Sequence, residues 1–202
     1  MLKSIVFDMG NVLRDFDPMY ALNALVEKQE DRTLLLNTIF KSDEWLQRDA
    51  GRLSRAQALR IWQSRLPQRL HEAADVVFEK WCEYMPNFDD MTALVKQLHE
   101  NGYPIYLLSN ASDAFETFKH TMDAFPFMDG AIVSYAYGVL KPDERIYRIL
   151  FETYGLNPEE CYFVDDSKAN VEAAEELGMR GYCYKEDTEK LIVDMRENAI
   201  RI

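Results

Sequence analysis

Five short apolar runs constrain the fold of this chain more than any other feature of its sequence. They are KSIVFD (3–8), PIYLLSN (104–110), AIVS (131–134), CYFVDD (161–166) and RGYCY (180–184). Apolar runs of about four to eight residues that are bounded by polar or turn residues are typical of strands buried in a sheet. The sequence therefore predicts five buried strands.

Segments with helical spacing lie between these runs. Their apolar stripes are Met91, Leu94, Val95 and Leu98; Phe115, Phe118 and Met122; Ile146, Ile149 and Leu150; and Val171, Ala174 and Leu177. Gly102 and Gly178 stand where helices end. Strands that alternate with helices indicate an α/β fold with a doubly wound (Rossmann-like) parallel sheet, which binds ligands beyond the carboxyl ends of its strands.

Residues 18–88 interrupt the alternation, because they contain amphipathic helices and no convincing strand. One stripe joins Leu59, Trp62 and Leu66, and a second runs from Val77 to Met85. We expect residues 18–88 to form an inserted all-helical cap over a core domain made of residues 1–17 and 89–202. The alternative is a helical packing layer that does not contact ligand.

Charge and cysteine content narrow the classes of function. The chain has 202 residues and a formal net charge of −12, which argues against non-specific binding to nucleic acid or to an anionic membrane. Its cysteines are Cys82, Cys161 and Cys183, an odd number in apolar surroundings, as expected of thiols in a reducing compartment. With no signal peptide and no apolar run of roughly 18 residues, we expect a cytoplasmic protein.

Polar side chains cluster at the predicted strand ends. Asp8 follows the first strand, and the later positions are Ser109, Asn110, Lys141, Asp165 and Asp166. Each residue alone has an ordinary explanation as a helix cap or a solvated charge. Three acids, a hydroxyl, an amide and a lysine at one sheet edge together predict a metal and phosphate site.

Phosphoryl transfer explains this combination of residues. A phosphate group approaching carboxylates needs Mg²⁺ to reduce repulsion, and Asp8 and Asp166 can supply its oxygen ligands. Lys141 would neutralise a phosphate oxygen, while the Ser109 hydroxyl and the Asn110 N–H would donate to others. The free oxygen of Asp8 could then attack phosphorus and form an aspartyl phosphate.

Four motifs in order, FDMGNVL, LLSNAS, LKPDERIY and FVDDSKANVEAAEELGM, resemble those of haloacid dehalogenase-like hydrolases with a helical cap. The resemblance spans essentially the whole chain and implies a Mg²⁺-dependent phosphatase. It implies the following roles: Asp8 as nucleophile and metal ligand, the Gly10 carbonyl as metal ligand, Ser109 and Asn110 as phosphate binders, Lys141 as catalytic cation, and Asp166 as metal ligand, with Asp165 beside it at the metal and Asn170 in support.

Gly10 departs from the family pattern. Most phosphatases of the superfamily have an Asp there, which protonates the leaving oxygen and later deprotonates the attacking water. Three explanations stay open: Asp15 or Asp17 replaces the acid, the substrate has an acidic leaving group, or the enzyme is slow or inactive. With no acid at all, the rate should depend steeply on leaving-group acidity.

The expected substrate is a small phosphorylated metabolite, such as a sugar 1-phosphate, because the motifs look most like the branch that includes the glucose-1-phosphate phosphatases. Trp45, Arg48 and Arg52 of the cap could meet a sugar face and an anion, or only pack and hold solvated charge. Two rivals remain. One is a 2-haloacid dehalogenase, which needs no metal, and the other is a catalytically impaired binding module, suggested by Gly10.

Overall fold

The computed structural model describes residues 2–202 and contains a five-stranded sheet in which all neighbouring strands are parallel. The strands are β1 (Ser4–Phe7), β2 (Ile105–Ser109), β3 (Gly130–Val133), β4 (Cys161–Asp165) and β5 (Arg180–Cys183), in the order β3-β2-β1-β4-β5. Each predicted apolar run forms one strand. The predicted α/β class with a parallel sheet is confirmed.

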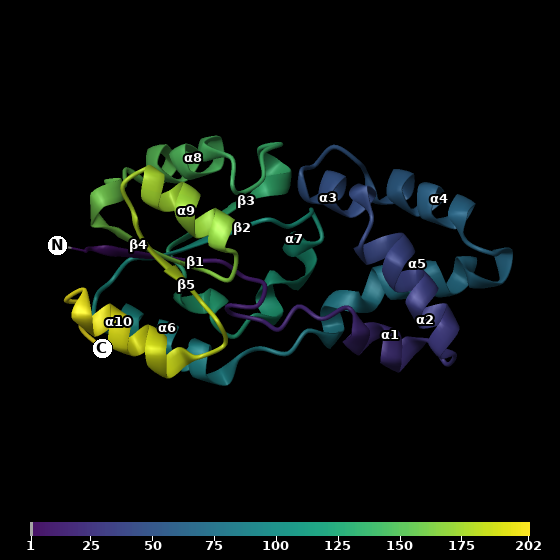
Figure 1. Cartoon of the computed structure of the whole chain (residues 1–202), viewed down its shortest axis with the longest axis horizontal. Helices are drawn as coiled ribbons and strands as arrows, with labels where there is room; N and C mark the ends of the chain where they lie inside the picture. The colour runs from purple at the N-terminus through teal and green to yellow at the C-terminus, as the bar shows by residue number, and fades with distance from the viewer. Residues whose placement is uncertain (1) are drawn as a thin grey trace.

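Helices cover both faces of this sheet (Figure 1). The helices α6 (Asp89–Glu100) and α10 (Thr188–Glu197) cover one face, and α8 (Glu144–Tyr154) and α9 (Lys168–Glu176) cover the other. Successive side chains of a strand point to opposite faces. Ile5 and Phe7 of β1 accordingly belong to the apolar cluster of α6 and α10, whereas Val6 belongs to that of α8 and α9.

The connections after β2 contain short helical pieces. These are α7 (Phe115–Phe118), η4 (Lys119–Thr121), η5 (Phe125–Phe127), η6 (Ser134–Ala136) and η7 (Pro158–Glu160). The α-helix predicted from Phe115 to Met122 is thus four residues long and continues as a 3₁₀ turn. The hydroxyls of Thr117 and Thr121 donate to carbonyls three residues earlier, a local bond that competes with regular helix.

The segment between β1 and α6 is helical. It contains α1 (Met19–Leu25), α2 (Gln29–Leu35), a π-helical turn η1 (Leu36–Phe40), α3 (Asp43–Asp49), α4 (Arg55–Arg65), η2 (Gln68–Leu70), α5 (His71–Lys80) and η3 (Trp81–Tyr84). Helices α1 to α5 form a group beyond one end of the sheet (Figure 1). We call this group the helical insert. Within residues 2–202, no helix has the length and apolar character that a membrane crossing requires.

Fully buried Trp62 packs at the centre of the insert. Its ring meets Phe78 edge-on at 4.7 Å between centroids, and its indole N–H donates to the Ser42 hydroxyl at 2.9 Å. The same hydroxyl accepts the backbone N–H of Trp45 and caps α3. One serine therefore ties the start of α3 to the core of the insert, which fixes the helix that faces the sheet.

Candidate active site

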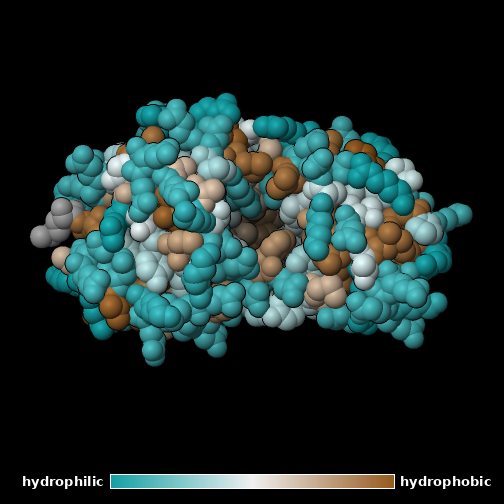
Figure 2. All heavy atoms as spheres, in the orientation of Figure 1, coloured by the Kyte–Doolittle hydropathy of each residue, from teal (hydrophilic) through white to brown (hydrophobic). Residues whose placement is uncertain are grey.

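A cavity of about 190 Å³ lies between the carboxyl ends of the strands and the helical insert, where Figure 2 shows a hollow between the two halves of the molecule. We call the following residues the polar floor: Asp8, Asn11, Ser109, Asn110, Lys141, Asp166 and Asn170. We call the following the apolar wall: Phe16, Trp45, Trp81, Met85 and Phe118. Gly10 and Asp49 also line the cavity. Asp165, the remaining predicted site residue, is fully buried beside Lys141.

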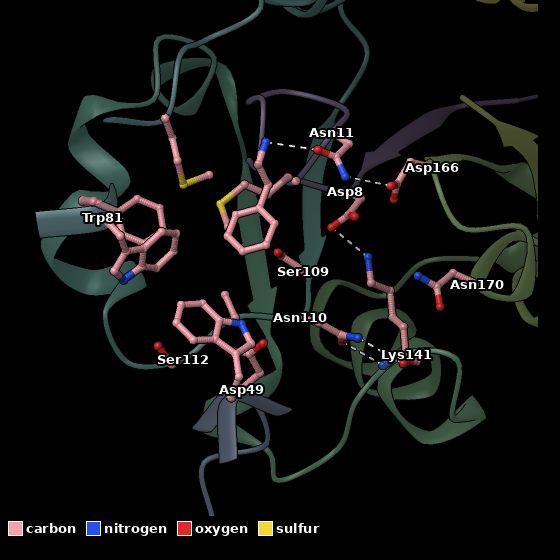
Figure 3. A pocket seen from close by; sticks show the side chains of 17 residues that line it. Asp8, Asn11, Asp49, Trp81, Ser109, Asn110, Ser112, Lys141, Asp166 and Asn170 are labelled. Carbon is pink, nitrogen blue, oxygen red and sulfur yellow. Dashed lines mark hydrogen bonds and ion pairs between the residues drawn. The ribbon is translucent and has the colours of Figure 1, made fainter. Parts of the chain in front are cut away.

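Lys141 lies at the centre of the polar floor (Figure 3). Its ammonium group is 2.8 Å from Oδ1 of Asp8, 2.6 Å from Oδ2 of Asp165 and 2.7 Å from the carbonyl of Leu108. Burial acts to lower the pKa of Lys141, but the two carboxylates outweigh it, and the net pKa is raised. Lys141 is therefore a fixed positive charge against Asp8.

Asn110 holds the backbone of Lys141 in place. Its side-chain N–H donates to the Lys141 carbonyl at 3.0 Å, and its side-chain oxygen accepts the Lys141 N–H at 2.8 Å. The two residues are 31 positions apart in the sequence. The Asn110 side chain thus has a positioning role that the sequence did not reveal. The fully buried strand β2 ends with Ser109 directly before it, and Ser109 itself lines the cavity.

Asp165 is enclosed by hydrogen-bond donors. Oδ1 accepts the backbone N–H of Ser167 at 2.8 Å, and Asn170 donates to both carboxylate oxygens at 3.0 and 3.1 Å. The Tyr147 hydroxyl donates to the carbonyl of Asn170 and anchors it in turn. Because the oxygens of Asp165 already accept from protein groups, this residue orients Lys141 more than it faces the cavity.

Asn11 is a site residue that sequence analysis missed. Its side chain donates to Oδ2 of Asp166 at 3.1 Å and accepts the backbone N–H of Phe16 at 3.0 Å. Its φ angle is 55°, in the left-handed region that Asn tolerates better than most residues. The Gly-Asn pair that begins two residues after Asp8 was the signal in the sequence, since such pairs are typical of tight turns.

Asp8, Asp165 and Asp166 bring carboxylate oxygens within 4.8 Å of one another. Three carboxylates beside one ammonium leave an excess of negative charge in a largely buried site. Burial raises the pKa of Asp8 to about 7 against the opposing effect of Lys141, and Asp165 adds to the rise. Hard oxygen ligands in excess of the local positive charge are the donor set that Mg²⁺ or Ca²⁺ uses.

Gly10 leaves room at the cavity where the family pattern would have a carboxylate. A Cβ at Gly10 would meet only the Cβ of Phe16, at an ordinary 3.6 Å. The two acids considered as replacements face elsewhere. Asp15 accepts from the hydroxyl of Tyr20 in an exposed setting, and exposed Asp17 accepts the N–H of Met19 at the start of α1; neither lines the cavity.

The apolar wall is an aromatic cluster. The rings of Trp45 and Trp81 are 5.1 Å apart, Phe16 meets Trp81 edge-on at 5.6 Å, and Phe118 does so at 5.9 Å. Trp45 therefore faces the cavity, which agrees with the interpretation that it could contact a substrate. Arg48 and Arg52 do not line the cavity, since Arg48 turns toward Asp113 and Arg52 is exposed. Lys141 is the one cationic side chain among the lining residues.

Asp49 is the second feature that sequence analysis missed. It ends α3 and is 8% exposed, and its carboxyl group lies in the cavity near Ser112 and the rings of the wall (Figure 3). Burial raises the pKa of Asp49 to about 8, although the charge of Arg48 and the backbone N–H of Ser112 oppose the rise. The cavity thus contains a carboxyl group whose neutral form is favoured by burial, in addition to the acids of the floor.

Comparison with known proteins gives one family. A model of the haloacid dehalogenase-like hydrolases matches residues 2–178. The sesquiterpene phosphatase astK of Aspergillus oryzae is 26% identical over 180 residues, which cover 89% of this chain and 88% of the relative. The D-ribitol-5-phosphate phosphatase of Bacteroides thetaiotaomicron is 25% identical over 191 residues, 90% of this chain and 91% of the relative.

The same fold occurs in a solved structure. A haloacid dehalogenase family enzyme of Bacteroides thetaiotaomicron, crystallised as a mutant with magnesium and inorganic phosphate, matches with a TM-score of 0.74 and 23% identity. The match covers 95% of this chain and 99% of that one. The parallel sheet and the helical insert are therefore arranged as in a protein of known structure.

Proposed function

Because the chain belongs to the haloacid dehalogenase-like hydrolase family, as its four motifs predicted, we propose that it is a magnesium-dependent phosphatase of small phosphate monoesters. The observation that carries the proposal is the polar floor. It places a buried carboxylate, Asp8, against the fixed charge of Lys141 and beside a second acid, Asp166. The two phosphatases among its relatives support the reaction, whereas their different substrates leave the leaving group open.

Magnesium fits the donor set of the floor. Asp8 and Asp166 present carboxylate oxygens, and we propose the Gly10 carbonyl as a third ligand, because Gly10 lines the same cavity two residues after Asp8. Asp165 belongs to the same cluster but accepts hydrogen bonds with both oxygens, so we assign it a supporting part at the metal. When bound, the ion would neutralise the acids and polarise the phosphate.

The residues of the floor then perform the chemistry. Lys141 and the Ser109 hydroxyl bind phosphate oxygens, and the backbone N–H of Asn110 donates to another. Asp8 attacks phosphorus with a carboxylate oxygen, the bond to the leaving oxygen breaks, and an aspartyl phosphate forms on Asp8. Water then attacks that phosphorus, which releases inorganic phosphate and restores Asp8.

The cavity favours a small substrate with an uncharged leaving group. Its volume of about 190 Å³ is below the roughly 300–1,000 Å³ typical of drug-sized ligand sites. Lys141 already faces Asp8, so the cavity offers no second cation for another anionic group. We propose a sugar 1-phosphate, since the rings of Trp45 and Trp81 could cover its apolar face and the Asp49 carboxyl could bind a hydroxyl.

The two parts of the chain that enclose the cavity have different proposed roles. We propose that residues 1–17 and 89–202 form the catalytic core domain and that residues 18–88 form a cap whose inner surface receives the leaving group. The wall residues Trp45 of α3 and Trp81 of η3 both lie within residues 18–88 and support this assignment.

A panel of phosphorylated metabolites, assayed with Mg²⁺ and with chelator, tests the proposal. We expect Mg²⁺-dependent phosphate release, strongest for sugar 1-phosphates and other small monoesters. Turnover of 2-haloacids without metal would instead show a dehalogenase. Tight binding of phosphate without turnover of any ester would show a binding module, and either result would overturn the proposal.

A further inference from the structure

Asp49 is a buried acid without a paired cation in a cavity that lacks an acid where one is expected. Its neighbour Arg48 faces the other way, since one guanidinium nitrogen contacts Asp113 at 2.5 Å and another donates to the carbonyl of Leu53 at 3.2 Å. The backbone N–H of Ser112 is the donor that faces the Asp49 carboxyl group. This acid therefore retains hydrogen-bonding capacity toward whatever enters the cavity.

The end of α3 is clamped onto the core domain, which fixes this carboxyl group. The buried hydroxyl of Ser134 donates to the backbone carbonyl of Asp49 at 2.5 Å. Two residues later Gly51 adopts a φ of 65°, and a Cβ there would collide with the carbonyl of Tyr135. The Arg48–Asp113 ion pair is a third contact between the insert and the core. Asp49 thus has a defined place opposite the polar floor.

We propose that Asp49 is the acid and base of this enzyme, in the role that Gly10 leaves empty. The inference rests on the proposed phosphatase function and adds the residue that serves the leaving group. As Asp8 forms its bond to phosphorus, the ester P–O bond breaks and the Asp49 proton moves to the leaving oxygen, which departs as an alcohol. The Asp49 carboxylate then takes a proton from the attacking water, the bond between phosphorus and Asp8 breaks, and phosphate leaves.

The protonation state of Asp49 agrees with this role. A general acid has to hold its proton near neutral pH, and burial raises the pKa of Asp49 to about 8. Arg48, the charged group that acts on it, forms its ion pair with Asp113 and none with Asp49. Asp15 and Asp17 have exposed settings outside the cavity and offer no comparable group.

Ethyl phosphate and 2,2,2-trifluoroethyl phosphate provide the test, because they are close in size and differ in leaving-group acidity. In Asp49→Asn, we expect kcat/KM for ethyl phosphate to fall by about 10²–10⁴-fold while the value for the trifluoroethyl ester changes far less. Asp43→Asn, the same change at an exposed position of α3, should leave both values as in the wild type. An equal loss for both esters, or no loss, would overturn the assignment.

Two further measurements separate catalysis from support of the fold. The double variant Gly10→Asp with Asp49→Asn should recover much of the lost activity toward ethyl phosphate, since a side chain fits at Gly10. A purely structural Asp49 would not be rescued. If Asp49→Asn does not fold, the pH dependence of the wild-type enzyme tests the assignment of Asp49 instead. The ethyl-to-trifluoroethyl rate ratio should fall above about pH 8, and a constant ratio rejects the role.

Failure of this inference is distinguishable from failure of the phosphatase proposal. If wild-type protein releases no phosphate from either ester with Mg²⁺, or if Asp8→Asn keeps full activity, the phosphatase proposal itself is wrong. If Asp8→Asn is inactive and Asp49→Asn retains the wild-type ratio, only the assignment of Asp49 is wrong.

Discussion

The polar floor and the apolar wall enclose the same cavity but are stabilised in different ways. In the floor, Lys141 contacts two carboxylates and a carbonyl, and Asn110 and Asn170 hold the groups around it. The wall consists of Met85 and of aromatic rings whose centroids are about 5 to 6 Å apart, and the carboxyl group of Asp49 beside it accepts from one backbone N–H, that of Ser112. Several ion pairs and hydrogen bonds hold each side chain of the floor in place, whereas the side chains of the wall are held mainly by apolar packing.

This contrast suggests which part fixes the reaction and which part fixes the substrate. Floor residues come mainly from the ends of strands and the loops that follow them, and the hydrogen-bonded parallel sheet fixes the register of those strands. Three of the five wall residues, Trp45, Trp81 and Met85, come from residues 18–88, a segment that joins the core by apolar packing and by polar contacts such as those of Ser134 and Arg48. Substitutions in the floor should therefore affect every substrate, and substitutions in the wall should discriminate between substrates.

The largest effect should come from the nucleophile. We predict that Asp8→Asn lowers kcat by about 10⁴-fold or more for every ester, because the amide cannot form the covalent intermediate. The fold should persist, since Lys141 keeps Asp165 as its partner. Phosphate release and circular dichroism measure the two properties. Substantial activity in a folded Asp8→Asn protein would remove Asp8 from the mechanism.

Lys141→Ala should weaken both catalysis and stability. Loss of the cation that faces the transferred phosphate should lower kcat/KM by about 10²–10³-fold. Two buried carboxylates also lose their partner, so the free energy of unfolding in chelator should fall by about 3–5 kcal/mol. Urea titration measures the second effect. The control Lys3→Ala removes an exposed ion pair with Glu160 and should cost no more than about 1 kcal/mol.

Asn110→Ala tests whether the floor depends on positioning. The variant keeps every charged group but releases the backbone of Lys141, so we expect kcat to fall by about 10–100-fold. Asn101→Ala also removes a long-range amide contact, to the carbonyl of Arg201 at the opposite end of the sheet, and should remain fully active. Equal activity of the two variants would show that Lys141 needs no such support.

The last prediction concerns stability in place of activity and sharpens the contrast between the wall and the floor. Asp49 ionises near its ordinary pKa of 3.8 when unfolded but near 8 when folded. Its contribution to stability is thus complete below about pH 4 and is lost as the pH rises to 8. Relative to wild type, Asp49→Asn should gain about 10–20 °C in Tm between pH 4 and pH 8. Asp43→Asn should show no such trend, and a flat difference for Asp49→Asn contradicts a buried neutral acid.

Sequence patterns were sufficient for the sheet and for most of the floor. Each apolar run became a strand, and the polar residues that follow Phe7, Leu108 and Val164 lie at one edge because parallel strands place their carboxyl ends together. Helix length was predicted less well where Thr117 and Thr121 bond to local carbonyls. The amphipathic spacing around Phe115 predicts which side chains are buried. The same spacing is expected for a single α-helical turn and for a longer helix, so it does not predict helix length.

The sequence by itself determined that Asp8, Lys141 and Asp166 lie together, because they follow strands whose carboxyl ends meet at one edge of the sheet. Only the tertiary structure showed that the carboxyl group of Asp49 lies in the same cavity as these residues. Asp49 is the last residue of a short helix, and the sequence around it does not indicate whether its side chain is buried or exposed to solvent. Its burial depends on contacts with Ser134 and Ser112, which lie more than 60 positions away. The protonation of a carboxyl group depends on its surroundings in space, and neighbours in the sequence do not fix those surroundings.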